Sequence, residues 1–148
     1  MKFRAHGSAS YQQEGQVLIA EIVGPWNLEL IHSYRKAASE RIPALAANGP
    51  WALIIVLRGA AICPQDAIDS IRAGAIEHVL RWQRICTAYV IGSEVEGYKV
   101  MDRVWHSIYA GVMPFAIFES NDEALHWVQQ RLLDVAAHPR LLVPDREP

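Results

Sequence analysis

The sequence has few cysteines, no long apolar run and no excess of charge of one sign. Its 148 residues include two cysteines, and the 14 basic and 16 acidic residues leave a net charge of -2. The longest apolar run, residues 51–57, is far shorter than the ~20 residues of a membrane-spanning helix. Balanced charge excludes the basic surface typical of proteins that bind duplex nucleic acid. We therefore expect no nucleic-acid partner and no membrane span.

The cysteines and the termini indicate where such a chain works. Cys63 and Cys86 form no CxxC pair and stand among apolar residues, so we expect both thiols to be reduced and buried. Residues 1–10 lack the apolar stretch of a secretory signal, which predicts a cytoplasmic protein. We expect residues 1–137 to form a single domain and residues 138–148, rich in proline, to be a flexible tail.

The motifs of several common α/β proteins are missing as well. No strand end carries the glycine-rich turn that binds nucleotide phosphates, and no serine stands in a GxSxG context. The six histidines include no HxH or HxxxH pair, so we expect no metal site and no cofactor. An enzyme using His78, Glu77, His106 or Asp102 remains an alternative, although neighbouring helical positions do not face each other. The main expectation is a protein without catalytic activity.

What the sequence does contain is an alternation of short β-rich runs and longer helical patterns. This order, β-β-α-β-α-β-α-β-α, predicts an α/β fold with a mixed, mostly parallel sheet of about five strands, opened by a β-hairpin, and four main helices. The predicted strands are residues 3–11, 16–23, 51–57, 85–91 and 115–118, and the predicted helices are residues 28–48, 64–82, 98–112 and 121–135.

Single residues define several of these boundaries. Asn27 is a good N-cap for the first helix, and Pro43 predicts a kink or break in that helix near Ile42. The segment Ser120-Asn-Asp-Glu123 has the pattern of a capping box and predicts the start of the last helix. Gly74 is expected to weaken the middle of the second helix.

The element order and the segment FAIFESNDEALHWV, residues 115–128, resemble the SpoIIAA-like proteins of the STAS superfamily over residues 17–133. The resemblance implies a binding or regulatory domain. In the anti-sigma-factor antagonists of that superfamily a phosphorylatable serine follows the central strand, whereas residues 63–66 here read Cys-Pro-Gln-Asp. The branch without this loop is similar in fold to lipid-binding domains of the Sec-fourteen type, which implies an apolar ligand or membrane contact.

The aromatic residues allow two interpretations. They can be plain core, or the second and third predicted helices can part to admit an apolar ligand. The second interpretation gives a candidate ligand groove made of Trp82, Tyr98, Met101, Trp105 and Tyr109. The crevice beyond the carboxyl ends of the strands gives a candidate anion or headgroup site made of Trp26, Asn27, Arg58 and Ser93. Arg58 can equally be a solvated charge at a strand end.

We therefore predict a STAS-like module that binds an apolar or amphipathic, lipid-like small molecule and that also contacts a membrane surface peripherally. The alternative is a protein-interaction module of the anti-sigma-factor-antagonist type without the phosphorylatable serine. An N-terminal edge strand and apolar helix faces are common contact surfaces, so we also expect a homodimer.

Overall fold

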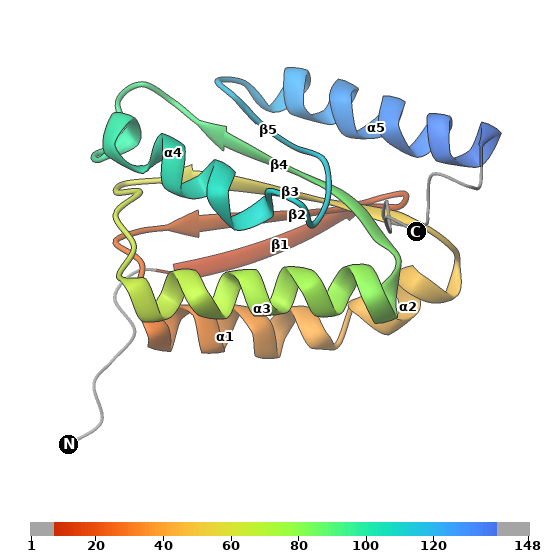
Figure 1. Ribbon diagram of the computed structural model, residues 1–148, viewed down its shortest axis with the longest axis horizontal. Helices are drawn as coiled ribbons and strands as arrows, with labels where there is room; N and C mark the ends of the chain where they lie inside the picture. The colour runs from red at the N-terminus through yellow and green to blue at the C-terminus, as the bar shows by residue number, and fades with distance from the viewer. Residues whose placement is uncertain (1–7, 139–148) are drawn as a thin grey trace.

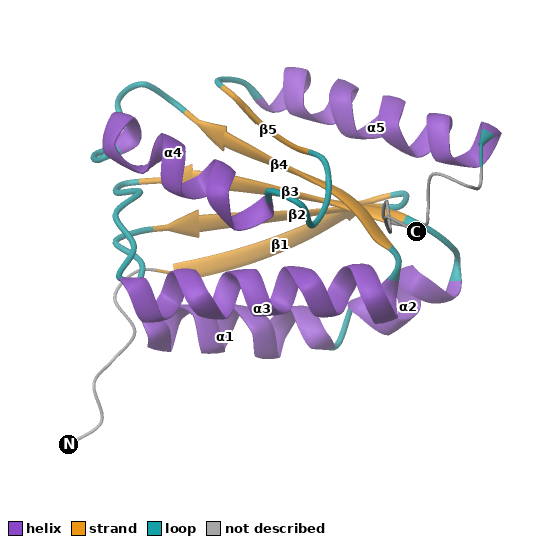
Figure 2. Cartoon of the chain, in the orientation of Figure 1, coloured by secondary structure: helices purple, strands orange, loops and turns teal. Residues whose placement is uncertain are grey.

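A computed structural model describes residues 8–138 as an α/β fold with one five-stranded mixed sheet and five helices (Figures 1 and 2). The sheet has the order β1-β2-β3-β4-β5, in which β1 is antiparallel to β2 and all other neighbours are parallel. The strands are β1 (Ser8–Glu14), β2 (Val17–Val23), β3 (Trp51–Arg58), β4 (Arg84–Ile91) and β5 (Phe115–Phe118). The helices are α1 (Leu28–Ser39), α2 (Ile42–Ala47), α3 (Gln65–Trp82), α4 (Tyr98–Tyr109) and α5 (Asn121–Ala137). The α/β class, the mixed sheet and the opening hairpin are confirmed.

The hairpin differs from the prediction in its turn. β1 continues to Glu14, so only Gly15 and Gln16 connect the two strands, and Gly15 has a φ of 59° that a residue with a Cβ rarely adopts. The polar residues Gln12 and Gln13 were expected in the turn, yet both lie in β1. They are tolerated there because β1 is an edge strand whose side chains are largely exposed. Residues 3–7 of the predicted first strand and residues 139–148 of the predicted tail lie outside the described residues.

The helices cover the two faces of the sheet unequally. α1, α2, α3 and α4 pack on one face of the sheet. They connect parallel strands that are added one after another at the same edge, and crossovers of the same hand then place every connecting helix on the same face. α5 lies on the other face and packs on β3 and β4 (Figure 1). β3 is in the middle of the sheet, and every one of its residues from Trp51 to Leu57 is buried, as its uniformly apolar sequence predicts.

Alternation along β3 divides the core in two. Leu53 and Ile55 point into the layer beneath α1 to α4, whereas Ile54 and Val56 point towards α5. The first layer is the larger and contains the buried aromatic side chains Trp51, Tyr89, Trp105 and Tyr109.

The helix boundaries follow their capping residues. The Asn27 side chain accepts a hydrogen bond from the Leu30 amide at 2.8 Å, and the Ser120 hydroxyl accepts one from the Glu123 amide at 3.2 Å. Pro43 lies in the first turn of α2, so the predicted break near Ile42 separates α1 from α2. This break accounts for a fifth helix where four main helices were predicted. Within residues 8–138, no helix is both long and apolar enough to cross a bilayer.

Candidate functional site

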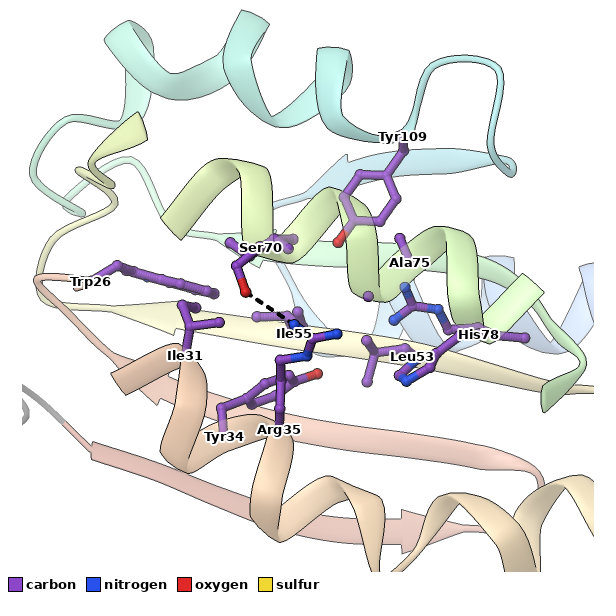
Figure 3. A pocket seen from close by; sticks show the side chains of 13 residues that line it. Trp26, Ile31, Tyr34, Arg35, Leu53, Ile55, Ser70, Ala75, His78 and Tyr109 are labelled. Carbon is purple, nitrogen blue, oxygen red and sulfur yellow. Dashed lines mark hydrogen bonds between the residues drawn. The ribbon is translucent and has the colours of Figure 1, made fainter. Parts of the chain in front are cut away.

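A cavity lies between α1, α3 and the sheet, with the end of α4 closing one side (Figure 3). Its empty volume is about 370 Å³, part of which is open to solvent. The cavity is narrow and has room for about two water molecules as it stands. We call it the inner cavity. Its lining residues are Trp26, Ile31, Tyr34, Arg35, Leu53, Ile55, Ser70, Ile71, Gly74, Ala75, His78, Arg84 and Tyr109.

Most of the wall of the inner cavity is apolar. Ile31 from α1, Leu53 and Ile55 from β3 and Ala75 from α3 are all buried and make up the floor and sides. Trp26, which follows β2, stands at the carboxyl ends of the strands. This composition suits the body of an apolar molecule.

Arg84 is the exception to this lining. It is the first residue of β4 and is only 4% exposed, and its Nε is buried without a hydrogen-bond partner. Within residues 8–138, no carboxylate forms an ion pair with it. The Arg84 guanidinium carbon lies over the Trp51 ring, 5.9 Å from its centroid, and this cation–π contact only weakly offsets the cost of burying the charge. The inner cavity therefore contains a buried positive charge without a counter-charge.

His78 of α3 lies beside this charge. Burial, Arg84 and Arg35, in that order of size, lower the pKa of His78 from 6.5 to about 3. The imidazole is therefore neutral at physiological pH, and its ring packs 5.7 Å from that of Trp51. Its Nδ1 is buried and has no hydrogen-bond partner.

Buried polar side-chain atoms without a hydrogen-bond partner, which we call orphaned, are concentrated around the inner cavity. Four such side-chain atoms are found among the described residues, and those of Trp26, His78 and Arg84 belong to the lining of the inner cavity. The fourth is Nε1 of Trp105, whose ring packs 5.3 Å from that of Trp26. Because buried polar groups in folded proteins are nearly always hydrogen-bonded, this concentration indicates a place that receives a polar ligand or ordered water.

Two tyrosines bring hydroxyl groups to the same region. Tyr34 reaches in from α1, and Tyr109 from the end of α4 (Figure 3). Burial raises the pKa of both phenols, so both remain protonated. The Tyr109 hydroxyl is hydrogen-bonded to that of Tyr89 at 2.8 Å, with either oxygen as the donor.

Arg35 lines the inner cavity and reaches from α1 across to α3. One of its terminal nitrogens donates a hydrogen bond to the Ser70 hydroxyl at 3.0 Å, and the other lies 3.9 Å from a Glu77 carboxylate oxygen. Gly74 lies between these two partners on α3, and a Cβ there would meet the guanidinium at 3.0 Å. The glycine that was expected to weaken α3 thus makes room for Arg35.

A second depression, which we call the outer groove, continues from the inner cavity and shares Tyr34, Arg35 and His78 with it. Its empty volume is about 670 Å³, including space open to solvent. Its lining residues are Tyr34, Arg35, Ala38, Ser39, Ile42, Pro43, Glu77, His78 and Trp82. Arg35 is therefore part of the wall of both the outer groove and the inner cavity.

The residues of the predicted ligand groove lie in three different places in the structure. Tyr109 lines the inner cavity and Trp82 lines the outer groove. Met101 and Trp105 are buried in the main core, where Trp105 packs between Trp26 and Tyr89, and Tyr98 packs against that core. The observed space lies between α1 and α3, whereas we expected it between the helices at residues 64–82 and 98–112.

The predicted headgroup residues do not come together. Arg58 points to the face of the sheet that carries α5 and forms an ion pair with Glu21 at 3.2 Å. Asn27 uses its side chain to cap α1, and Ser93 is exposed in the loop after β4. Only Trp26 of this set lines the inner cavity.

Arg84, Arg35, Tyr34 and Ser70 were missed by the sequence reasoning. Arg84 stands just before an apolar strand, and nothing in the sequence distinguishes a buried arginine there from an exposed one. One signal was present in α3, where Ser70, Gly74 and His78 recur every four residues and therefore form one stripe on its inward side.

The residues of the enzyme alternative lie on two helices. On α4, His106 is 3.9 Å from Asp102, and both side chains are about half exposed. On α3, Glu77 contacts Arg35, while His78 lines the inner cavity. Among the described residues, no group of three histidine, cysteine or acidic side chains could hold a metal ion.

The fold and the site define an α/β protein with a narrow, mainly apolar cavity and a buried cation. Comparison with family models, with curated proteins and with solved structures finds no match for this chain.

Proposed function

We propose that this protein binds a small molecule with an apolar body in its inner cavity and does not act as an enzyme. The observation that carries the proposal is a mainly apolar cavity, three of whose lining residues have a buried polar atom without a hydrogen-bond partner. This combination of apolar walls and a few polar groups is the usual make-up of a small-molecule site. The element order also supports placing the chain among STAS-like, SpoIIAA-like domains.

Widening the inner cavity from the side of the outer groove requires Arg35 to move, because Arg35 lines both. Its ion pair with Glu77 is long, and the two side chains are 36% and 47% exposed, so it contributes only about 0–1 kcal/mol. One hydrogen bond to Ser70 is the other polar contact that holds it on α3. A ligand arriving through the outer groove can therefore displace Arg35 at low cost and widen the space between α1 and α3.

The first test is native mass spectrometry of the gently purified protein, which detects a co-purified small molecule and the oligomeric state together. Titration calorimetry with 1-octanol and octanoate as probes then measures binding directly. We expect a reproducible extra mass that is lost on denaturation, or binding of at least one probe. A clean apo mass with no binding of either probe would contradict the proposal. A stoichiometric protein partner in place of a small molecule would favour the protein-interaction alternative.

A matched pair of variants locates the site. Ala75 is buried in the wall of the inner cavity, whereas Ala73 is exposed on the same helix. Ala75→Leu fills the cavity and is expected to abolish binding, while Ala73→Leu makes the same substitution outside it and leaves binding unchanged. Circular dichroism and thermal unfolding check that both variants fold. Equal binding by Ala75→Leu and the wild type would place the ligand elsewhere.

A further inference from the structure

We propose that the ligand of the inner cavity is an apolar carboxylic acid, bound as its anion with the carboxylate against Arg84. This inference rests on the proposed function and specifies the class of ligand.

Arg84 is a buried cation without a counter-charge among the described residues. A buried charge without a partner strongly destabilises a fold, so buried arginines are normally paired with carboxylates. None of the residues that line the inner cavity is acidic. The nearby Glu77 contacts Arg35 on the outer groove and is about half exposed. A carboxylate supplied by a ligand would provide the missing counter-charge.

The two ends of the inner cavity differ in their chemistry. Arg84 begins β4 and Trp26 follows the end of β2, and these strands run parallel in the sheet, so the two residues mark opposite ends of the inner cavity. One end therefore offers a cation and the rest offers apolar walls. A molecule with a single acidic head and an apolar body fits this polarity, with its head at Arg84 and its body towards Trp26.

The positive charge in the inner cavity matches a carboxylate better than a phosphate. Arg84 is the only buried guanidinium in the lining of the inner cavity, because Arg35 is 36% exposed and also lines the outer groove. A planar carboxylate can accept two parallel hydrogen bonds from one guanidinium and is neutralised by its single charge. The Tyr34 hydroxyl lines the same space and can add a third donor. A phosphate dianion would bring a second charge into an apolar cavity that contains one buried cation.

The experiment compares octanoate with 1-octanol, which have the same chain length, by titration calorimetry at pH 7.5. A charge-assisted hydrogen bond predicts that the wild type binds octanoate at least about tenfold more tightly than 1-octanol. Acetate and inorganic phosphate serve as anions without an apolar body, and neither should bind measurably. Phosphate binding tighter than that of octanoate would overturn the proposal in favour of a simple anion site.

The matched variants are Arg84→Met and Arg84→Lys. Arg84→Met keeps an unbranched, though shorter, side chain and removes its charge, so it should lose the preference for octanoate but retain 1-octanol binding. Arg84→Lys retains the charge and should keep part of the preference. In the absence of ligand, Arg84→Met should be as thermostable as the wild type or more so, because it removes an unpaired buried charge. A structural role for Arg84 would instead lower its stability and leave the ratio of the two affinities unchanged.

The outcomes separate this inference from the proposed function. Equal affinity of the wild type for octanoate and 1-octanol, with both lost in Ala75→Leu, would overturn the carboxylate and leave the apolar cavity in place. No binding of either probe would overturn both and would indicate that ordered water satisfies the orphaned polar atoms. The comparison of octanoate with 1-octanol in the wild type needs no substitution, so it tests the preference for a carboxylate even if Arg84→Met does not fold.

Discussion

His78 should make this protein sensitive to acid in a measurable way. Burial, with Arg84 and Arg35 nearby, holds the folded-state pKa at about 3, against 6.5 for an unperturbed histidine. Below pH 6.5 the unfolded chain therefore binds a proton at His78, whereas the folded chain does not. Protonation then favours the unfolded chain, so the free energy of unfolding decreases as the pH falls towards 3. The slope is about 1.4 kcal/mol per pH unit, so between pH 7 and pH 4.5 the loss is about 2–3 kcal/mol.

The assay is urea unfolding of the wild type, His78→Leu and His32→Gln at pH 7 and pH 4.5. Carboxylates titrate in the same range, so the informative quantity is the difference in pH dependence between the wild type and each variant. His78→Leu should lose about 2–3 kcal/mol less than the wild type on acidification. His32 is exposed, and His32→Gln should behave as the wild type does. Identical pH dependence in His78→Leu and the wild type would refute the reasoning, as would an NMR titration of His78 near pH 6.5.

Two further predictions concern the buried hydroxyls and thiols. Tyr109→Phe should cost about 1–3 kcal/mol because it leaves the buried Tyr89 hydroxyl without its partner, and Tyr89→Phe with Tyr109→Phe should cost less than the sum of the single changes. Additive losses in this urea-unfolding cycle would contradict the coupling. Burial raises the pKa of Cys63 and Cys86 to about 12, so at pH 8 both should react with a thiol reagent roughly a thousandfold more slowly than free cysteine. Rapid modification of the native protein would show that a thiol is accessible.

Most of the fold could be predicted because its signals are local. The apolar run of β3, the capping residues Asn27 and Ser120 and the break at Pro43 each depend on a few neighbouring residues. The hairpin turn was misplaced because edge position overrides local polarity, and Gln12 and Gln13 resemble turn residues until their strand is known to be exposed. Local patterns do not show which strand is at the edge.

The candidate site could be predicted much less well, because it depends on which side chains meet after folding. Tyr109 was predicted in the apolar ligand groove and Trp26 in the headgroup site, and the structure places both in the wall of one cavity. Arg84 was not selected, because burial of a strand-end arginine depends on α1 and α3 covering it from other parts of the chain. Arg58 was selected for its position at a strand end, but side-chain alternation sends it to the opposite face.

The order of the strands has a consequence for how the chain is made. Each strand from β2 onwards pairs with the strand that precedes it, so no strand has to enter between two that are already joined. A chain emerging from the ribosome can therefore extend the sheet at one edge, element by element, without rearranging what has already formed. Arg84 is added to the wall only after α1 and α3 exist to cover it. α5 emerges last of the described elements and covers the face that the earlier helices leave open.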